Sequence, residues 1–151
     1  MARLCNTIFT IALMSGAGSS LPVWADESGT AKLVQGAVRV ERDGASMPLR
    51  VGDRLLEKDR VVVPAGGAAG ITLRDDTRIS LGSGAILVLN QFKFDPQTQE
   101  GNVDTSILNG AMRYITGLVG RHRREAIRVS TATTTVGIRG TDFIVEVGDG
   151  P

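Results

Sequence analysis

The feature that most restricts the fold of this chain is a series of short alternating apolar runs separated by turn residues. Residues 32–40 alternate apolar and polar side chains and lead into the tight-turn pair Asp43-Gly44, and similar runs recur to the C-terminal end. Alternation with a period of two places one face of a strand in a core. About ten such runs predict an all-β single domain, and the pattern leaves a sandwich and a coiled β-roll both open.

Residues 103–119 fit either a helix or a strand. Apolar residues recur at helical spacing from Ile107 to Val119. Gly110 and Gly117 oppose a helix, because a glycine inside one costs up to about 1 kcal/mol. We therefore predict strands in this segment.

Three shorter segments have clearer signals. Residues 74–77 separate two alternating runs and predict a hairpin turn, and residues 95–102 contain Pro96 and Gly101 and predict a polar surface loop. Phe92 and Phe94 are two positions apart, so a strand there directs both rings to one face, as core residues.

The first 25 residues are typical of an export signal. A positive start is followed by an apolar run, and the small residues Val23 and Ala25 fit a signal-peptidase site after Ala25. The run is shorter than the roughly 20 apolar residues of a membrane span; an uncleaved anchor is the alternative. Residues 1–25 are thus predicted to be a signal peptide and residues 26–151 a periplasmic or secreted domain. Cys5 leaves with the signal, and we expect no stable membrane span in the mature chain.

The residue inventory argues against an enzyme and against nucleic-acid binding. The chain has 17 basic and 16 acidic residues, so no net field attracts a polyanion. His122 is the only histidine and lies among arginines, where we expect a solvated side chain. The sequence contains no nucleophile elbow and no zinc or calcium motif. We predict no catalytic residue, no metal and no cofactor.

The basic run at residues 121–124 is predicted to form a short loop. Arg121, Arg123 and Arg124 could contact a phosphate or an anionic envelope polymer there. The alternative is a solvated edge that discourages aggregation between strands.

The segment TTTVGIRGTDF, residues 133–143, is the most distinctive motif. Its β-branched flanks predict strands, whereas a nucleic-acid-clamping Gly-x-x-Gly loop joins helices and a phosphate loop precedes one. We therefore predict a strand connection in which the glycines permit positive φ or close backbone approach. Arg139 and Asp142 are predicted to form an ion pair across Gly140, a structural lock that holds two strands in register. A contact surface for a partner is the alternative.

Residues 26–151 resemble the FecR-like domain family. The strongest similarities are VGD at residues 51–53, the hairpin at residues 75–81, FKFDP at residues 92–96 and the stretch from 131 to 143. Its family-motif residues are Gly137, Arg139, Gly140, Thr141, Asp142 and Phe143. The resemblance implies a β-rich periplasmic or exported module, named for a regulator that carries a ferric-citrate uptake signal from an outer-membrane receptor to a sigma factor.

This chain departs from that regulator in two respects. It begins with a signal peptide in place of a cytoplasmic arm, and it stops at Pro151, where we expect relatives to add further strands. We predict a non-enzymatic exported module that binds another envelope protein, in signalling or in surface assembly, by edge-strand or loop contact, with an edge left unpaired that a partner strand could complete. Binding of an anionic envelope polymer through Arg121, Arg123 and Arg124 is the alternative. A true sigma regulator would require a cytoplasmic segment.

Overall fold

The computed structural model describes residues 27–136, 138 and 140–148. Twelve strands account for most of this range. They are β1 (Glu27–Gln35), β2 (Arg39–Arg42), β3 (Ala45–Pro48), β4 (Arg54–Leu56), β5 (Arg60–Val62), β6 (Ala68–Leu73), β7 (Arg78–Leu81), β8 (Ile86–Phe94), β9 (Gly101–Ile115), β10 (Ile127–Ser130), β11 (Thr135–Val136) and β12 (Asp142–Val147). A short helix α1 (Leu118–His122) and a 3-10 turn η1 (Arg124–Ala126) lie between β9 and β10. The predicted signal peptide lies outside the described residues.

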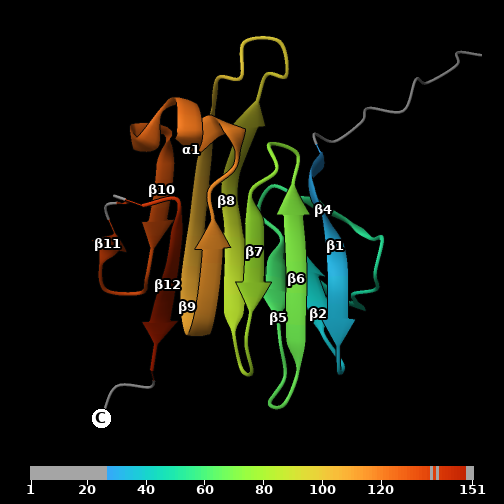
Figure 1. The fold of residues 1–151 in the computed structure, drawn as a ribbon. Helices are drawn as coiled ribbons and strands as arrows, with labels where there is room; N and C mark the ends of the chain where they lie inside the picture. The colour runs from blue at the N-terminus through green and yellow to red at the C-terminus, as the bar shows by residue number, and fades with distance from the viewer. Residues whose placement is uncertain (1–26, 137, 139, 149–151) are drawn as a thin grey trace, which may run out of the picture.

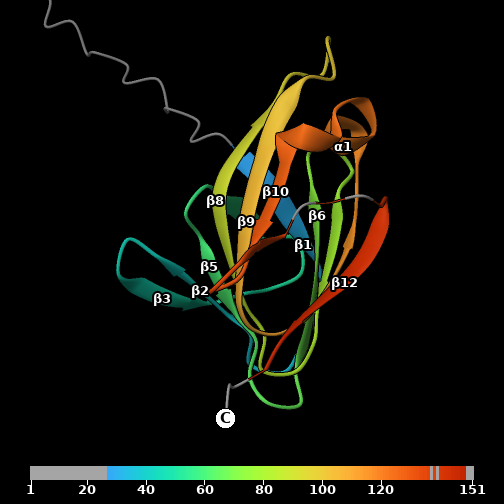
Figure 2. The ribbon, with the colours of Figure 1, turned by 90° about the vertical axis from the view of Figure 1, so that its left-hand side faces the viewer.

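All the strands belong to one sheet that curls over on itself, which confirms the all-β fold (Figure 1). Its main path runs β3-β2-β5-β8-β9-β7-β6-β1-β4, and pairing is antiparallel except between β9 and β10. The long strand β9 is shared by two facing layers. Its first part pairs with β8 and β10, and its last part pairs with β7 and β12. The curl therefore produces a sandwich-like body from one continuous sheet (Figure 2).

The strand prediction for residues 103–119 is confirmed as far as Ile115. Gly110, which argued against a helix, lies where β9 passes from one layer to the other. Gly110 has a φ of +78°, and a Cβ placed there would lie 2.6 Å from the Cα of Ala85. The Asn109 side chain donates a hydrogen bond to the Gly84 carbonyl at 3.0 Å. A residue with a side chain would thus strain the point where β9 leaves one layer for the other. Beyond the strand, α1 begins at Leu118.

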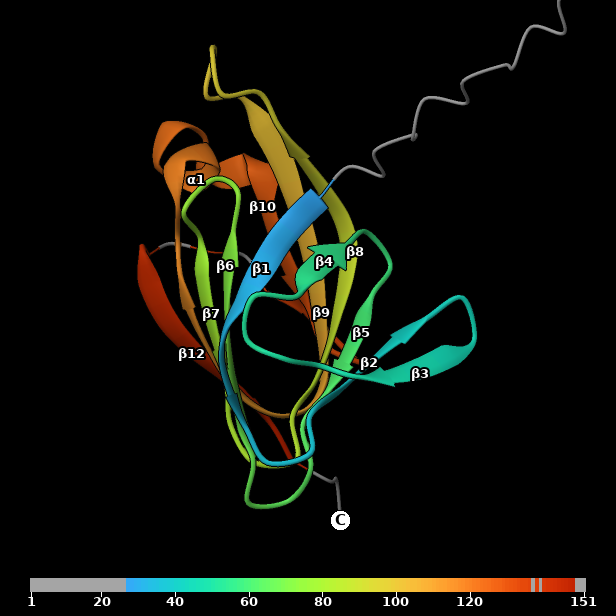
Figure 3. The same ribbon diagram turned by 90° about the vertical axis from the view of Figure 1, so that its right-hand side faces the viewer.

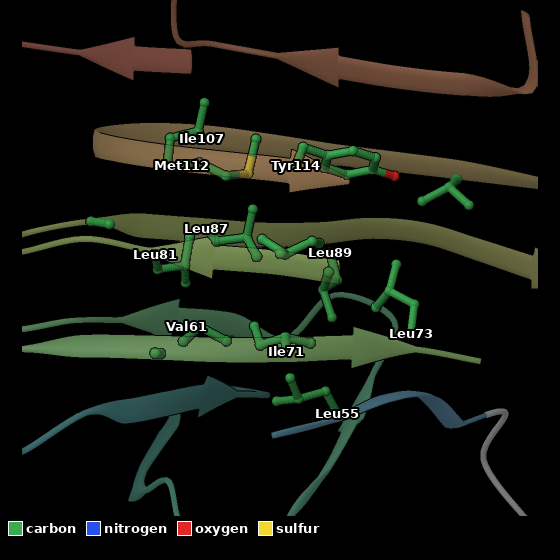
Figure 4. Packing of buried hydrophobic residues seen from close by; sticks show 14 of the residues in the cluster. Leu55, Val61, Ile71, Leu73, Leu81, Leu87, Leu89, Ile107, Met112 and Tyr114 are labelled. Atoms are coloured by element: carbon green, nitrogen blue, oxygen red, sulfur yellow. The ribbon is translucent and has the colours of Figure 1, made fainter. Parts of the chain in front are cut away.

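The core lies between the two layers (Figure 4). The β6 strand alternates half-buried and buried residues along its whole length, as a period of two requires. Fully buried side chains converge from both layers, among them Val61, Ile71, Leu87, Ile107, Met112 and Tyr114. Each such side chain contributes about 1.5–3 kcal/mol relative to an exposed one. Phe92 is buried and Phe94 half-buried against the core, as predicted.

The turns follow the sequence closely. The β2–β3 hairpin turns through Asp43 and Gly44, both with positive φ, and projects from the body (Figure 3). Residues 74–77 join β6 to β7 as predicted, and the loop between β8 and β9 rises above the body in Figure 1.

A buried ion pair ties together the ends of several strands. Arg42 on β2 donates to Asp59 from Nε to Oδ1 at 2.7 Å and from Nη2 to Oδ2 at 2.6 Å. Asp59, just before β5, is completely buried and also accepts the Leu56 amide at 2.8 Å. Arg42 reaches the Arg54 carbonyl on β4 as well, at 3.2 Å. The hydrogen bond to Asp59 raises the pKa of Arg42 above its usual value. This pair fixes β2, β4 and β5 relative to one another.

Candidate functional site

The distinctive segment at residues 133–143 connects the two layers of the curled sheet. Within it, Thr135–Val136 form β11, which pairs with β10, and its last two residues begin β12, which pairs with the last part of β9. The flanking strands predicted from the sequence are therefore confirmed. Gly137 and Arg139 lie outside the described residues.

Gly140 and Thr141 immediately precede β12. At Gly140 the prediction of positive φ or close backbone approach is wrong, because its φ is not in the left-handed range and the nearest atom to an added Cβ, the Asp142 carbonyl oxygen, is 3.7 Å away. Thr141 has a structural contact through its backbone, since its carbonyl accepts the Thr116 amide at 2.8 Å. That bond joins the start of β12 to the end of β9.

The Asp142 carboxylate is bound by Arg113 of β9. Arg113 donates from Nε to Oδ1 at 3.0 Å and from Nη2 to Oδ2 at 2.6 Å. These hydrogen bonds lower the pKa of Asp142 and raise the pKa of Arg113 from their ordinary values. The side chains are 53% and 44% exposed for Arg113 and Asp142, so this ion pair is open to solvent. The predicted pairing with Arg139 stays a prediction, because Arg139 lies outside the described residues.

Sequence reasoning missed Arg113, which lies 29 positions before Asp142. No local pattern relates the two residues. The β9–β12 register brings Arg113 opposite Ile144, one step along the strand face from Asp142. Only the pairing of distant strands could have identified this partner.

Phe143 faces the core side of β12. Its ring stacks on Tyr114 with 5.1 Å between centroids and 20° between planes. Tyr114 is fully buried, and this burial raises the pKa of its hydroxyl above the usual range. The stack anchors the family-motif phenylalanine in the core, so Phe143 has a packing role.

The outer edge of β12 is the most extended free strand edge in the described part of the chain. Among the described strands, β12 pairs only with β9. The other strands at ends of the pairing network have four residues in β3, three in β4 and two in β11, against six in β12. Short length and proline, as in β3 with Pro48, protect an edge from added strands. β12 is longer than these strands and contains no proline.

The side chains of β12 are also incompletely covered. Ile144, on its outer face, is 70% exposed, the highest value among the exposed large apolar residues of the described chain. Its alternate side chains turn toward the core but are only partly buried: Phe143, Val145 and Val147. An unpaired edge with apolar residues on both faces is suited to receive another strand.

The basic run is not the simple loop predicted from the sequence. Arg121 and His122 end α1, and Arg124 begins η1, because the Arg121 and Arg123 amides donate to the Gly117 and Val119 carbonyls. His122 and the three arginines are exposed, and no described residue forms a salt bridge with Arg121, Arg123 or Arg124.

Only one of these three arginines lines a groove beside η1. The groove has a volume of about 510 Å³. Its apolar side chains come from β10, from β11 and from Ile138. Its charged side chains are Arg124, Glu125 and Arg128. The structure therefore does not bring Arg121 and Arg123 together with Arg124 in that hollow.

Asp75 occupies a buried position that the turn prediction did not anticipate. Its carboxylate accepts the Thr77 amide at 3.1 Å and the Thr77 hydroxyl at 2.8 Å. Its carbonyl accepts the Leu118 amide at 2.7 Å, and Thr77 accepts the Gly117 amide at 3.0 Å. Burial raises the pKa of Asp75 above its ordinary value. These bonds attach the β6–β7 turn to the start of α1 and define a structural cluster.

The described residues contain no group of three or more histidine, cysteine, aspartate or glutamate side chains that could hold a metal ion. In the same ranges, none of the helices has the length and apolar character needed to cross a membrane.

The fold and its exposed features define a small all-β module with an open strand edge. Residues 59–151, more than half of the chain, match the family model described as FecR protein. The chain therefore belongs to the FecR family. The searches of curated proteins and of solved structures gave no match. FecR domains are envelope-associated regulatory modules that act in transmembrane signalling through protein interactions.

Proposed function

We propose that this chain is a non-enzymatic, exported module that binds another protein of the bacterial envelope through the outer edge of β12, in transmembrane signalling or surface assembly. The observation that carries the proposal is the six-residue unpaired edge with Ile144 exposed at its centre. Added strands bind such edges through main-chain hydrogen bonds, and side-chain pockets supply specificity. Family membership supports the compartment and the use of protein contacts.

Export depends on the predicted signal peptide at residues 1–25, with the mature chain beginning at Asp26. A module that acts by strand pairing requires no cofactor, and its partner needs only a free strand in the same compartment.

Photo-crosslinking in intact cells tests the proposal. A photoreactive amino acid at Glu146 is expected to give a discrete adduct with an envelope protein, and the added substitution Ile144→Lys is expected to remove that adduct. The control places the probe at Leu33, a large apolar residue exposed on β1. Equal adducts at both positions, or an adduct that is insensitive to Ile144→Lys, would overturn the assignment to β12.

A second candidate function is favoured by the three exposed arginines without salt bridges among the described residues. Arg121, Arg123 and Arg124 would bind an anionic envelope polymer, with affinity that falls as salt rises. Binding to dextran sulfate measures this. Replacement of these three arginines by glutamine should abolish the salt-dependent binding, whereas the same replacement at the exposed Arg50, Arg74 and Arg78 should retain it. Equal loss in both triple variants would attribute the binding to general charge.

A further inference from the structure

We infer that the strand accepted by β12 belongs to a different protein and carries a lysine or arginine opposite Glu146, with apolar residues on its core-facing side. The inference rests on the proposed function, because it specifies the partner of the same edge. Figures 2 and 3 show β12 at the outer boundary of its layer, where a further strand could be added.

The core-facing side of β12 requires apolar partners. Six apolar residues are only partly buried against the core, and four of them lie between residues 138 and 147: Ile138, Phe143, Val145 and Val147. The inward residues of β6 and β7, by contrast, are all buried. The core is therefore thinly covered along one rim. A strand with apolar residues at alternate positions would cover that rim by the same period-two pattern.

The outer face of β12 has one free charge. Asp142 is already bound by Arg113, whereas Glu146 forms no salt bridge with a described residue. Glu146 lies opposite Ala111 on β9, and Arg113, one step along the same face of β9, donates its hydrogen bonds to Asp142 instead. Opposite charges directly across two strands stabilise the pairing, and an apolar residue opposite Ile144 would bury it.

A second copy of this chain is a poor match for the edge. Antiparallel self-pairing centred on Ile144 would place Asp142 of each copy opposite Glu146 of the other. Like charges in that position destabilise a strand pair. Self-pairing centred on Val145 would place Ile144 opposite Glu146 at both ends, so no carboxylate would gain a cation. The charge pattern of β12 thus favours a partner with its own basic strand.

Two synthetic seven-residue peptides test this chemistry with the purified protein. Both have valines at alternate positions on one face. On the other face, one carries Lys-Ile-Lys and the other Glu-Ile-Glu, so that isoleucine opposite Ile144 places the charged residues opposite Asp142 and Glu146. Fluorescence anisotropy of labelled peptides measures the affinities. Wild type should prefer the lysine peptide, by up to about fivefold for each opposite-charge pair.

The Glu146→Lys variant should reduce or reverse this preference, and Glu100→Lys in the β8–β9 loop should leave it unchanged. If wild type binds both peptides equally and Ile144→Lys weakens both, the charge inference is wrong while docking on β12 stands. If Ile144→Lys changes the binding of neither peptide, or neither binds, both proposals fail. A dimer that Ile144→Lys dissociates would identify a second copy as the partner and overturn the inference.

Discussion

Two Arg–Asp pairs with nearly the same bidentate geometry occur in different regions of this molecule. In the Arg42–Asp59 pair the carboxylate is completely buried and the arginine side chain is 30% exposed. In the Arg113–Asp142 pair the two side chains are 53% and 44% exposed. Both have a shortest contact of 2.6 Å. Water competes for the second pair and hardly reaches the first, so equal geometry does not imply equal energy.

The difference matches the regions that the pairs occupy. Asp59, just before β5, is completely buried and accepts hydrogen bonds from Arg42 of β2 and from the Leu56 amide of β4. Asp142 begins β12, whose outer edge is open and whose inward side chains are half-covered. The first region is built for stability. The second retains an unpaired strand edge, which is where we place the binding function.

The largest expected effect is at the buried pair. Arg42→Ala leaves the Asp59 carboxylate buried without its cation and should lower the free energy of unfolding by about 3–5 kcal/mol. Urea unfolding followed by circular dichroism measures this. Arg39→Ala, on the exposed face of the same strand, is the matched control and should stay within about 0.5 kcal/mol of wild type. Equal midpoints for the two variants would show that the Arg42–Asp59 pair contributes no more to stability than an exposed arginine on the same strand.

A smaller effect is expected at Asp75, a buried carboxyl that accepts hydrogen bonds from Thr77 and forms no salt bridge with a described residue. Its pKa is raised in the folded state, so the fold favours the protonated form. Its contribution to stability is therefore greatest below the ordinary carboxyl pKa and declines as pH rises through the raised value, by at most about 1.4 kcal/mol per pH unit. Asp75→Asn should remove this decline in unfolding curves recorded from pH 4 upward. The exposed neighbour provides the control, Asp76→Asn, which should keep the wild-type pH dependence.

The smallest effect is expected at the exposed pair. A double-mutant cycle of Arg113→Gln and Asp142→Asn should give a weak coupling that decreases further in high salt. Because the pKa of Asp142 is lowered, any contribution is present above the ordinary carboxyl pKa and lost as pH falls through the lowered value. A coupling as large as that expected for a buried ion pair would mean that β12 is held as firmly as the strands around Asp59. The same cycle with Arg139→Gln tests the predicted Arg139–Asp142 pair.

Much of the fold could be predicted from local pattern. The all-β class, the turns at residues 43–44 and 74–77, and the core position of Phe92 follow from alternation and turn chemistry, which act over a few residues. The candidate site was harder to predict from the sequence. The motif around Asp142 was recognisable, but its partner Arg113 and its stacking residue Tyr114 come from another strand. The basic run was visible, but its division between α1 and η1 was not.

The sequence by itself determined the strand period, the turn positions and the family motif, because these depend on side-chain alternation and backbone preference along the chain. Only the tertiary structure decided which aspartates are buried, where β9 changes layer and which edge stays open. Asp59, Asp75 and Asp142 all lie at turns or strand ends in the sequence. Whether each carboxylate is buried, and which group it pairs with, depends on strands that are far away along the chain.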